Sequence, residues 1–314
     1  MIIRILILSC LFQSVGYSQS EYVKYYEITE TAAYKKKKEE YQSAINLYKK
    51  AFLLAEPRGS DHLELASCYI KLGAYDESLE QIKMSIELGI PKRYIERLKS
   101  SNEGNDEFEK LWIKIQEIYP ELRRQFYSSI DIETFNELQI IKNSDQEIRE
   151  YLMSREGFFE DSTLVSYAKT IDSLNLEKVL KIIERTGQWP GSKSFGDAES
   201  GSYYVLLHYN VEHFKDAIEN EKLYNHILTT AKKGIELGEL TPFQFAYWID
   251  YHIKTKEGKQ LYGVPSYKKW AKIPFKDVEN IDKRRMEIGL PSLETLYKRE
   301  NKELPDWYKK GNKK

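Results

Sequence analysis

The chain has 314 residues, in which 48 Lys and Arg stand against 49 Asp and Glu, for a formal net charge of -1. This balance argues against a nucleic-acid binder, and the content of 16 Gly and 9 Pro argues against a collagen-like or disordered chain. With 41% hydrophobic residues the chain can bury ordinary cores, and its length suggests about two domains.

The N-terminal segment has the pattern of an export signal. Arg4 precedes an apolar run over 5–12, and a small-x-small pattern suited to signal peptidase ends at Ser18. We therefore expect a signal peptide over 1–18 and an exported protein, periplasmic or secreted. Two alternatives remain, which are a lipoprotein signal with its lipid on Cys10 and an uncleaved, buried N-terminal helix. No later segment has the roughly twenty apolar residues of a membrane-spanning helix, so no transmembrane segment is expected.

Similar residues recur at a constant spacing of 34 residues after this segment. The period is typical of tetratricopeptide helix pairs, in which small residues let two helices approach and a proline stops the second helix. Gly73 supplies the left-handed residue of a tight turn in the second unit, and a shortened third unit follows. We expect a tetratricopeptide-like array over 21–122, whose groove binds a protein or peptide. The matched pairs are Ala32 and Ala66, Tyr41 and Tyr75, Ala44 and Ser78, Tyr48 and Ile82, Ala51 and Ser85, and Pro57 and Pro91.

A second helical domain is expected after Tyr119-Pro120. Ser144, followed three residues later by Glu147, has the pattern of a capping box that opens a helix. No alternating strand of useful length is found, so the predicted fold class is all-α, a repeat array followed by a C-terminal helical domain. Further helices are predicted over 162–185, 202–209, 211–237 and 242–257.

Polar motifs occur in a fixed order through this second part. They are Asp145-Gln146-x-x-Arg149, Asp172-x-x-Asn175, Gly187-x-Trp189-Pro190, His208-x-Asn210, Asp250, Tyr262-Gly263 and Asp282-x-x-Arg285-x-x-x-Gly289-Leu290. The order resembles an uncharacterised bacterial domain family, over about residues 125–297, whose members also carry helical repeats ahead of the domain. The resemblance implies no particular activity. Members usually have Asp two residues after the His, where this chain has Asn210, which cannot act as a base.

The motif residues supply the candidates for a site. Asp145 with Arg149, and Asp172 with Asn175, each share one helix face because residues three or four apart are neighbours. Asp250 falls on an apolar stripe, which would raise its pKa unless a cation pairs with it. The catalytic candidates are Asp145, Asp172, His208 and Asp250, and the ligand-binding candidates are Arg149, Asn175, Asn210 and Arg285.

Other features favour structural roles. No motif indicates a metal or a cofactor, Cys68 is expected to be a buried thiol, and the Lys35–Lys38 run is expected to be a solvated helix face. The basic tail, 298–314, is expected to be frayed or in weak contact with an anionic surface. The sequence thus predicts an exported module that binds a protein, peptide or other ligand through its repeats. The alternative is a hydrolase-like enzyme with an acid–base site of Asp and His residues. No oligomeric state is indicated.

Overall fold

The computed structural model describes residues 20–154, 161–196, 199–208, 217–264, 273–306 and 308. Within these ranges the fold is all-α, and the β-structure consists of an isolated bridge between Gln260 and Phe275. No helix in the same ranges combines the length and apolar character that crossing a bilayer requires. The predicted signal peptide over 1–18, together with Cys10, lies outside the described residues, and so does Asn210.

The N-terminal part is built from helices that pack as sequential pairs, α1 on α2 and α3 on α4. Ala32, Ala44, Ala66 and Ser78 are fully buried, so backbones approach closely at the helix contacts. Gly73, in the turn between α3 and α4, has the left-handed φ of 72° that only glycine adopts without strain. The bounds are α1 Glu21–Lys37, α2 Tyr41–Phe52, α3 Gly59–Lys71, α4 Tyr75–Glu87, α5 Lys92–Ser100 and α6 Asp106–Ser129.

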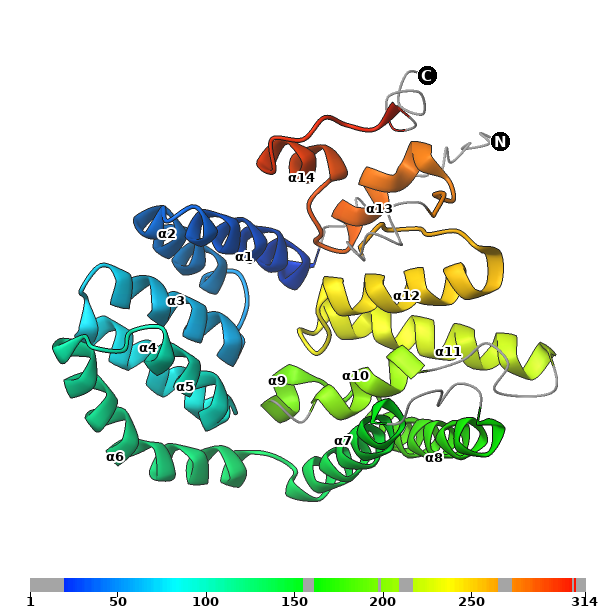
Figure 1. Cartoon of the computed structure of the whole chain (residues 1–314), viewed down its shortest axis with the longest axis horizontal. Helices are drawn as coiled ribbons and strands as arrows, with labels where there is room; N and C mark the ends of the chain where they lie inside the picture. The colour runs from blue at the N-terminus through cyan, green and yellow to red at the C-terminus, as the bar shows by residue number, and fades with distance from the viewer. Residues whose placement is uncertain are drawn as a thin grey trace, which may run out of the picture.

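At Tyr119-Pro120, after which the sequence predicts a second domain, α6 runs through Pro120 without ending. A proline inside a helix removes one backbone hydrogen bond and bends the helix. Figure 1 shows α6 changing direction along its length before it leads to α7. The bend at Pro120 therefore directs the chain toward the C-terminal helices.

The C-terminal part contributes longer helices and two short terminal ones. The capping box predicted at Ser144 is wrong, because Ser144 lies inside α7, whose N-cap is Asp131. The Ser144 hydroxyl instead donates to the Ile141 carbonyl, 3.0 Å away. The bounds are α7 Ile132–Met153, α8 Ser162–Thr186, α9 Ser192–Phe195, α10 Glu199–His208, α11 Ala217–Glu236, α12 Pro242–Glu257, α13 Ile281–Glu287 and α14 Leu293–Arg299.

Two helices end where the sequence predicts, because both carry strong terminal signals. Gly187 follows α8 with a φ of 72°, and Gly258 follows α12 with a φ of 64°. At the start of α12, Thr241 and Gln244 form a capping box, and Pro242 occupies the first turn. These caps set the end of α8, which carries Asp172, and both ends of α12.

The largest hydrophobic core joins the two ends of the molecule. Tyr25 and Tyr26 of α1 are buried in the same cluster as side chains of α7, α8, α11 and α12. The Tyr26 hydroxyl donates to the Leu240 carbonyl at 3.3 Å, just before α12. Figure 1 shows the helices following a curved path that brings α1 back beside α12 and α13. The N-terminal helix is thus part of the C-terminal core.

The C-terminal segment also packs against the body of the protein. The Arg299 guanidinium lies over the ring of Tyr34 on α1, and the Tyr34 hydroxyl donates to the Arg299 carbonyl at 3.0 Å. Tyr308 is buried in a small cluster with Ile281 and Leu293. The expectation of a frayed tail is therefore wrong at these positions, because aromatic side chains anchor them.

Candidate functional site

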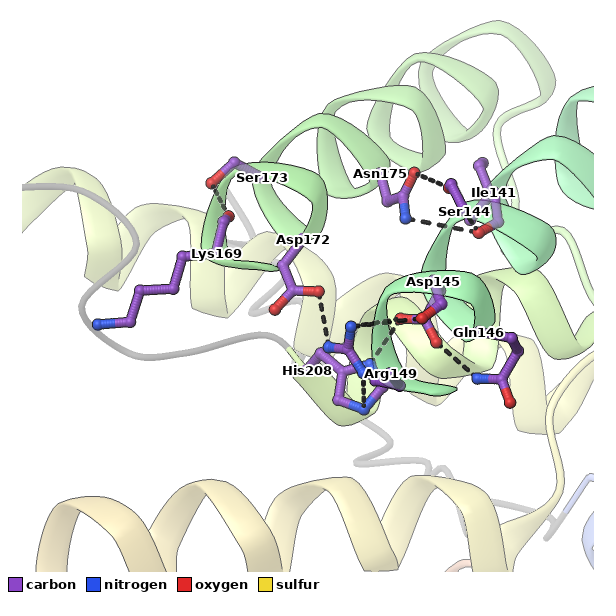
Figure 2. A network of polar contacts seen from close by, with 10 residues as sticks. All are labelled: Ile141, Ser144, Asp145, Gln146, Arg149, Lys169, Asp172, Ser173, Asn175 and His208. Atoms are coloured by element: carbon purple, nitrogen blue, oxygen red, sulfur yellow. Dashed lines mark hydrogen bonds and ion pairs between the residues drawn. The ribbon is translucent and has the colours of Figure 1, made fainter. Parts of the chain in front are cut away.

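Three helices bring four predicted site residues together. Asp145 and Arg149 lie one turn apart on α7, Asp172 lies on α8, and His208 is the last residue of α10. Figure 2 shows their side chains pointing toward one another between these helices. We call Asp145, Arg149, Asp172 and His208 the polar cluster.

Arg149 lies at the centre of the polar cluster and contacts each of its other members. Its Nε donates to Nε2 of His208 at 3.0 Å, and its Nη2 donates to Oδ1 of Asp172 at 2.7 Å. Its Nη1 lies 3.6 Å from Oδ1 of Asp145. A guanidinium has only donors, so all three neighbours must present acceptor atoms to it.

These contacts determine the tautomer of His208. Because Arg149 Nε can only donate, Nε2 of His208 must be unprotonated and accept. The other ring nitrogen, Nδ1, lies 2.7 Å from Oδ1 of Asp145 and donates its proton there. The imidazole is therefore neutral, with the proton on Nδ1, and the ring of Tyr204 stacks parallel to it with centroids 6.4 Å apart.

The exposed fraction of the side chain differs sharply among the members of the polar cluster. The Asp145 side chain is 1% exposed, whereas those of Asp172 and Arg149 are 18% exposed and that of His208 is 27% exposed. Asp145 is also held by Gln146, whose amide donates to Oδ2 at 2.7 Å. Burial raises the pKa of Asp172, while the positive charge of Arg149 opposes that rise. The carboxylate of Asp145, which orients His208, is thus fully buried, whereas Arg149, Asp172 and His208 reach solvent.

Asn175 belongs to the helix contact rather than to the polar cluster. It is buried, and its amide oxygen, 3.1 Å from the Ser144 hydroxyl oxygen, shares the single hydroxyl proton with the Ile141 carbonyl. This bond fixes α8 against α7 one turn away from Asp172. The sequence correctly placed Asp172 and Asn175 on one helix face, but the structure gives Asn175 a positioning contact.

Asp250 and Arg285 lie apart from the polar cluster and tie down the segment after α12. The Asp250 carboxylate accepts from the backbone N–H groups of Leu261, Tyr262 and Val264 at 2.6, 2.7 and 2.9 Å. Burial raises the pKa of Asp250, and these N–H donors act in the opposite direction. Arg285 donates to the Tyr262 carbonyl, so both predicted site residues hold a loop in place.

The polar cluster also has the donor types of a metal site. One oxygen of Asp145, one of Asp172 and one ring nitrogen of His208 lie within 4.8 Å of one another. Two carboxylates and an imidazole can bind a divalent cation. Arg149 already places a positive charge among these same acceptors, so a metal ion would have to displace its guanidinium.

Sequence reasoning missed a cavity of about 430 Å³ between the N-terminal helices and α9 and α12. Arg58 and Tyr94 line one side, and Ser192 and Gln244 line the other. Residues so far apart in the chain give no local pattern, although the positions on α3 and α5 belong to the predicted array. Arg97 also lines the cavity and lies over the ring of Tyr94.

Comparisons of the chain with protein-family models, with curated proteins and with solved structures find no match. The resemblances to tetratricopeptide repeats and to the uncharacterised bacterial domain family therefore stay predictions.

Proposed function

We propose that the polar cluster is the acid–base site of a hydrolase-like enzyme that acts on a small anionic substrate. The observation that carries the proposal is the neutral His208, held at Nδ1 by the buried Asp145, with its basic Nε2 directed at Arg149. A carboxylate that orients an imidazole in this way is the arrangement that general bases use in acyl-transfer enzymes.

Arg149 gives the site a preference for negative charge. A substrate carboxylate or phosphate can take the place of the His208 nitrogen at Arg149 Nε, while Nη2 keeps its contact with Asp172, since planar guanidinium groups bind such anions through their N–H donors. When Arg149 Nε donates to the substrate, Nε2 of His208 becomes free to accept a proton. The same anion that binds thus makes the base available.

The proton balance of the reaction involves His208 alone. Nε2 takes a proton from an attacking water, the positive imidazolium is stabilised by Asp145 at Nδ1, and Nε2 then returns the proton to the leaving group. Asp172, paired with Arg149 at 2.7 Å, keeps the guanidinium in place through the cycle.

A substrate panel tests this proposal. The purified protein is assayed against carboxylate-bearing esters and amides and against phosphoesters. Replacement His208→Gln should lower the rate on any accepted substrate by about a hundredfold or more, because a positioned base contributes roughly that factor. The matched control is His226→Gln, which removes an exposed histidine of α11 and should leave the rate unchanged. Equal rates for the native protein and His208→Gln on every accepted substrate would contradict an acid–base role.

A second candidate function is binding of a peptide by the N-terminal helices, in an exported protein. The cavity lined by Arg58, Tyr94 and Gln244 favours it, because a mixed apolar and cationic wall of this size suits a few residues of an extended peptide. Selection from a displayed peptide library, repeated with Tyr94→Ala, tests it. Enriched peptides that bind both proteins equally would exclude this cavity.

A further inference from the structure

The structure brings together two basic segments that are more than 260 residues apart in the sequence. Lys37 and Lys38, at the end of α1, and Arg299 and Lys302, at and after the end of α14, line one cavity of about 610 Å³. Glu30 and Glu300 also line it, which leaves a formal excess of two positive charges. We call this space the basic cavity.

Within the run of four lysines, the structure separates paired from unpaired side chains. Lys35 pairs with Glu40 at 2.6 Å, and Lys36 pairs with Glu64 at 2.5 Å. Among the residues that the structure describes, Lys37 and Lys38 form no ion pair, and Lys38 lies over the ring of Tyr34. All four lysines reach solvent, in line with the prediction of a solvated helix face: Lys37 and Lys38 are exposed, and Lys35 and Lys36 are half-buried.

The wall of the basic cavity is held in a defined arrangement. The Tyr34 ring has the Arg299 guanidinium 4.9 Å from its centroid and Lys38 Nζ 5.8 Å from it. Arg299 also donates to Oγ1 of Thr31 at 2.9 Å. Since these contacts fix Arg299 without an ion pair to any described residue, its charge is preorganised toward an incoming anion.

The shape and chemistry of the basic cavity together define a class of ligand. A single phosphate occupies a small part of 610 Å³, and the Tyr34 ring with Ala33 and Leu296 provides an apolar wall. We propose that the basic cavity binds a soluble organic ligand that carries two phosphate or sulfate groups, such as a sugar bisphosphate. The positive charge of the lining attracts such a ligand, and the apolar wall suits its carbon frame.

Calorimetry with fructose 1,6-bisphosphate as the probe tests the proposal, with fructose as the uncharged comparison. Replacing Lys37 and Lys38 together by Gln should weaken binding by about tenfold or more, because both unpaired cations are lost. The matched control replaces Lys35 and Lys36 by Gln in the same helix turn, where the ion pairs to Glu40 and Glu64 already satisfy the charges. This control should bind the bisphosphate as the native protein does.

Three outcomes would overturn the proposal. They are the absence of bisphosphate binding, an equal loss of binding in the two double variants, and binding to phosphatidylserine vesicles that the free bisphosphate does not compete away. The last outcome would show a membrane surface rather than a soluble ligand. Because the basic cavity shares no residue with the polar cluster, this result is independent of any activity at His208.

Discussion

Arg149 determines which nitrogen of His208 carries the ring proton, because a donor-only side chain facing Nε2 requires that atom to accept and leaves the proton on Nδ1. The spacing of Asp145 and Arg149 on one helix predicted that they are neighbours, since residues four apart share a face. Nothing local predicted that Asp172 and His208 join them, because that contact depends on how α8 and α10 pack on α7.

The sequence predicts an apolar environment for Asp250, and the structure has one. The partners of its carboxylate are backbone N–H groups, however, and not the cationic side chain that the sequence suggested. Three N–H groups of the segment after α12 point at one carboxylate. Such a nest of donors depends on the loop's conformation, which the sequence pattern did not specify.

Replacing Asp250 by Asn should lower the free energy of unfolding by about 3 kcal/mol, because an amide cannot accept from all three backbone donors while buried. Urea denaturation measures this change. The control Asp106→Asn alters an exposed residue in the first turn of α6 and should change stability by less than about 0.5 kcal/mol. Equal effects of the two substitutions would show that the loop contacts contribute nothing.

Helix ends were predictable where several signals coincide and were mispredicted where one signal stood alone. At α12 a capping box, a first-turn proline and a terminal glycine agree, and the prediction is confirmed at both ends. At Ser144 a single Ser-x-x-Glu pattern occurs inside α7, where the hydroxyl bonds back to the preceding turn. The difference arises because Ser can bond to backbone within a helix as well as at its start.

The packing of α11 against α12 makes the stability of the protein depend on pH through one buried histidine. His252 of α12 is buried and stacks on Tyr224 of α11, with ring centroids 4.1 Å apart. Burial, helped by the charge of Lys256, lowers the pKa of His252 from its ordinary 6.5 to about 4. Between pH 6.5 and pH 4 the unfolded chain binds a proton on this histidine and the folded chain does not. The contribution of His252 to the free energy of unfolding should therefore be complete above about pH 6.5 and fall as the pH drops toward 4.

Urea denaturation at pH 7.5 and pH 4.5 measures this effect. The native protein should lose more stability between the two values than His252→Gln, which cannot take up the proton. Identical losses in the two proteins would mean that His252 does not contribute to acid sensitivity.

At the scale of the whole molecule, the N-terminal helices and the C-terminal helices meet at contacts that no local pattern encodes. All-α architecture was predictable from periodicity, but the burial of Tyr25 and Tyr26 in the C-terminal core was not, because aromatic residues suit both grooves and cores. A second contact joins the turn after α4 to the end of α9. A Cβ on Gly89 would lie 2.9 Å from Gly196 Cα and 2.7 Å from the ring of Phe126.

Substituting Gly89 by Ala tests whether this approach holds the two parts together. Gly89 has a φ of 93°, whereas Gly73 has a φ of 72° and open space, with no atom within 4 Å of the point where a Cβ would lie. Gly73→Ala should therefore cost about 1–2 kcal/mol for backbone strain alone, whereas Gly89→Ala should cost about 2 kcal/mol more. If the two substitutions lower the free energy of unfolding equally in urea denaturation, the close approach to Gly196 adds nothing to the loss of stability.

Asp145 and Arg149 together hold His208 as a base with its ring proton on Nδ1. Long-range ¹H–¹⁵N NMR of the histidine rings at pH 7.5, assigned by comparison with His208→Gln, observes that proton directly. We expect a protonated Nδ1 and an unprotonated Nε2 for His208. A proton on Nε2, or the averaged shifts of a ring exchanging freely with solvent, would contradict it.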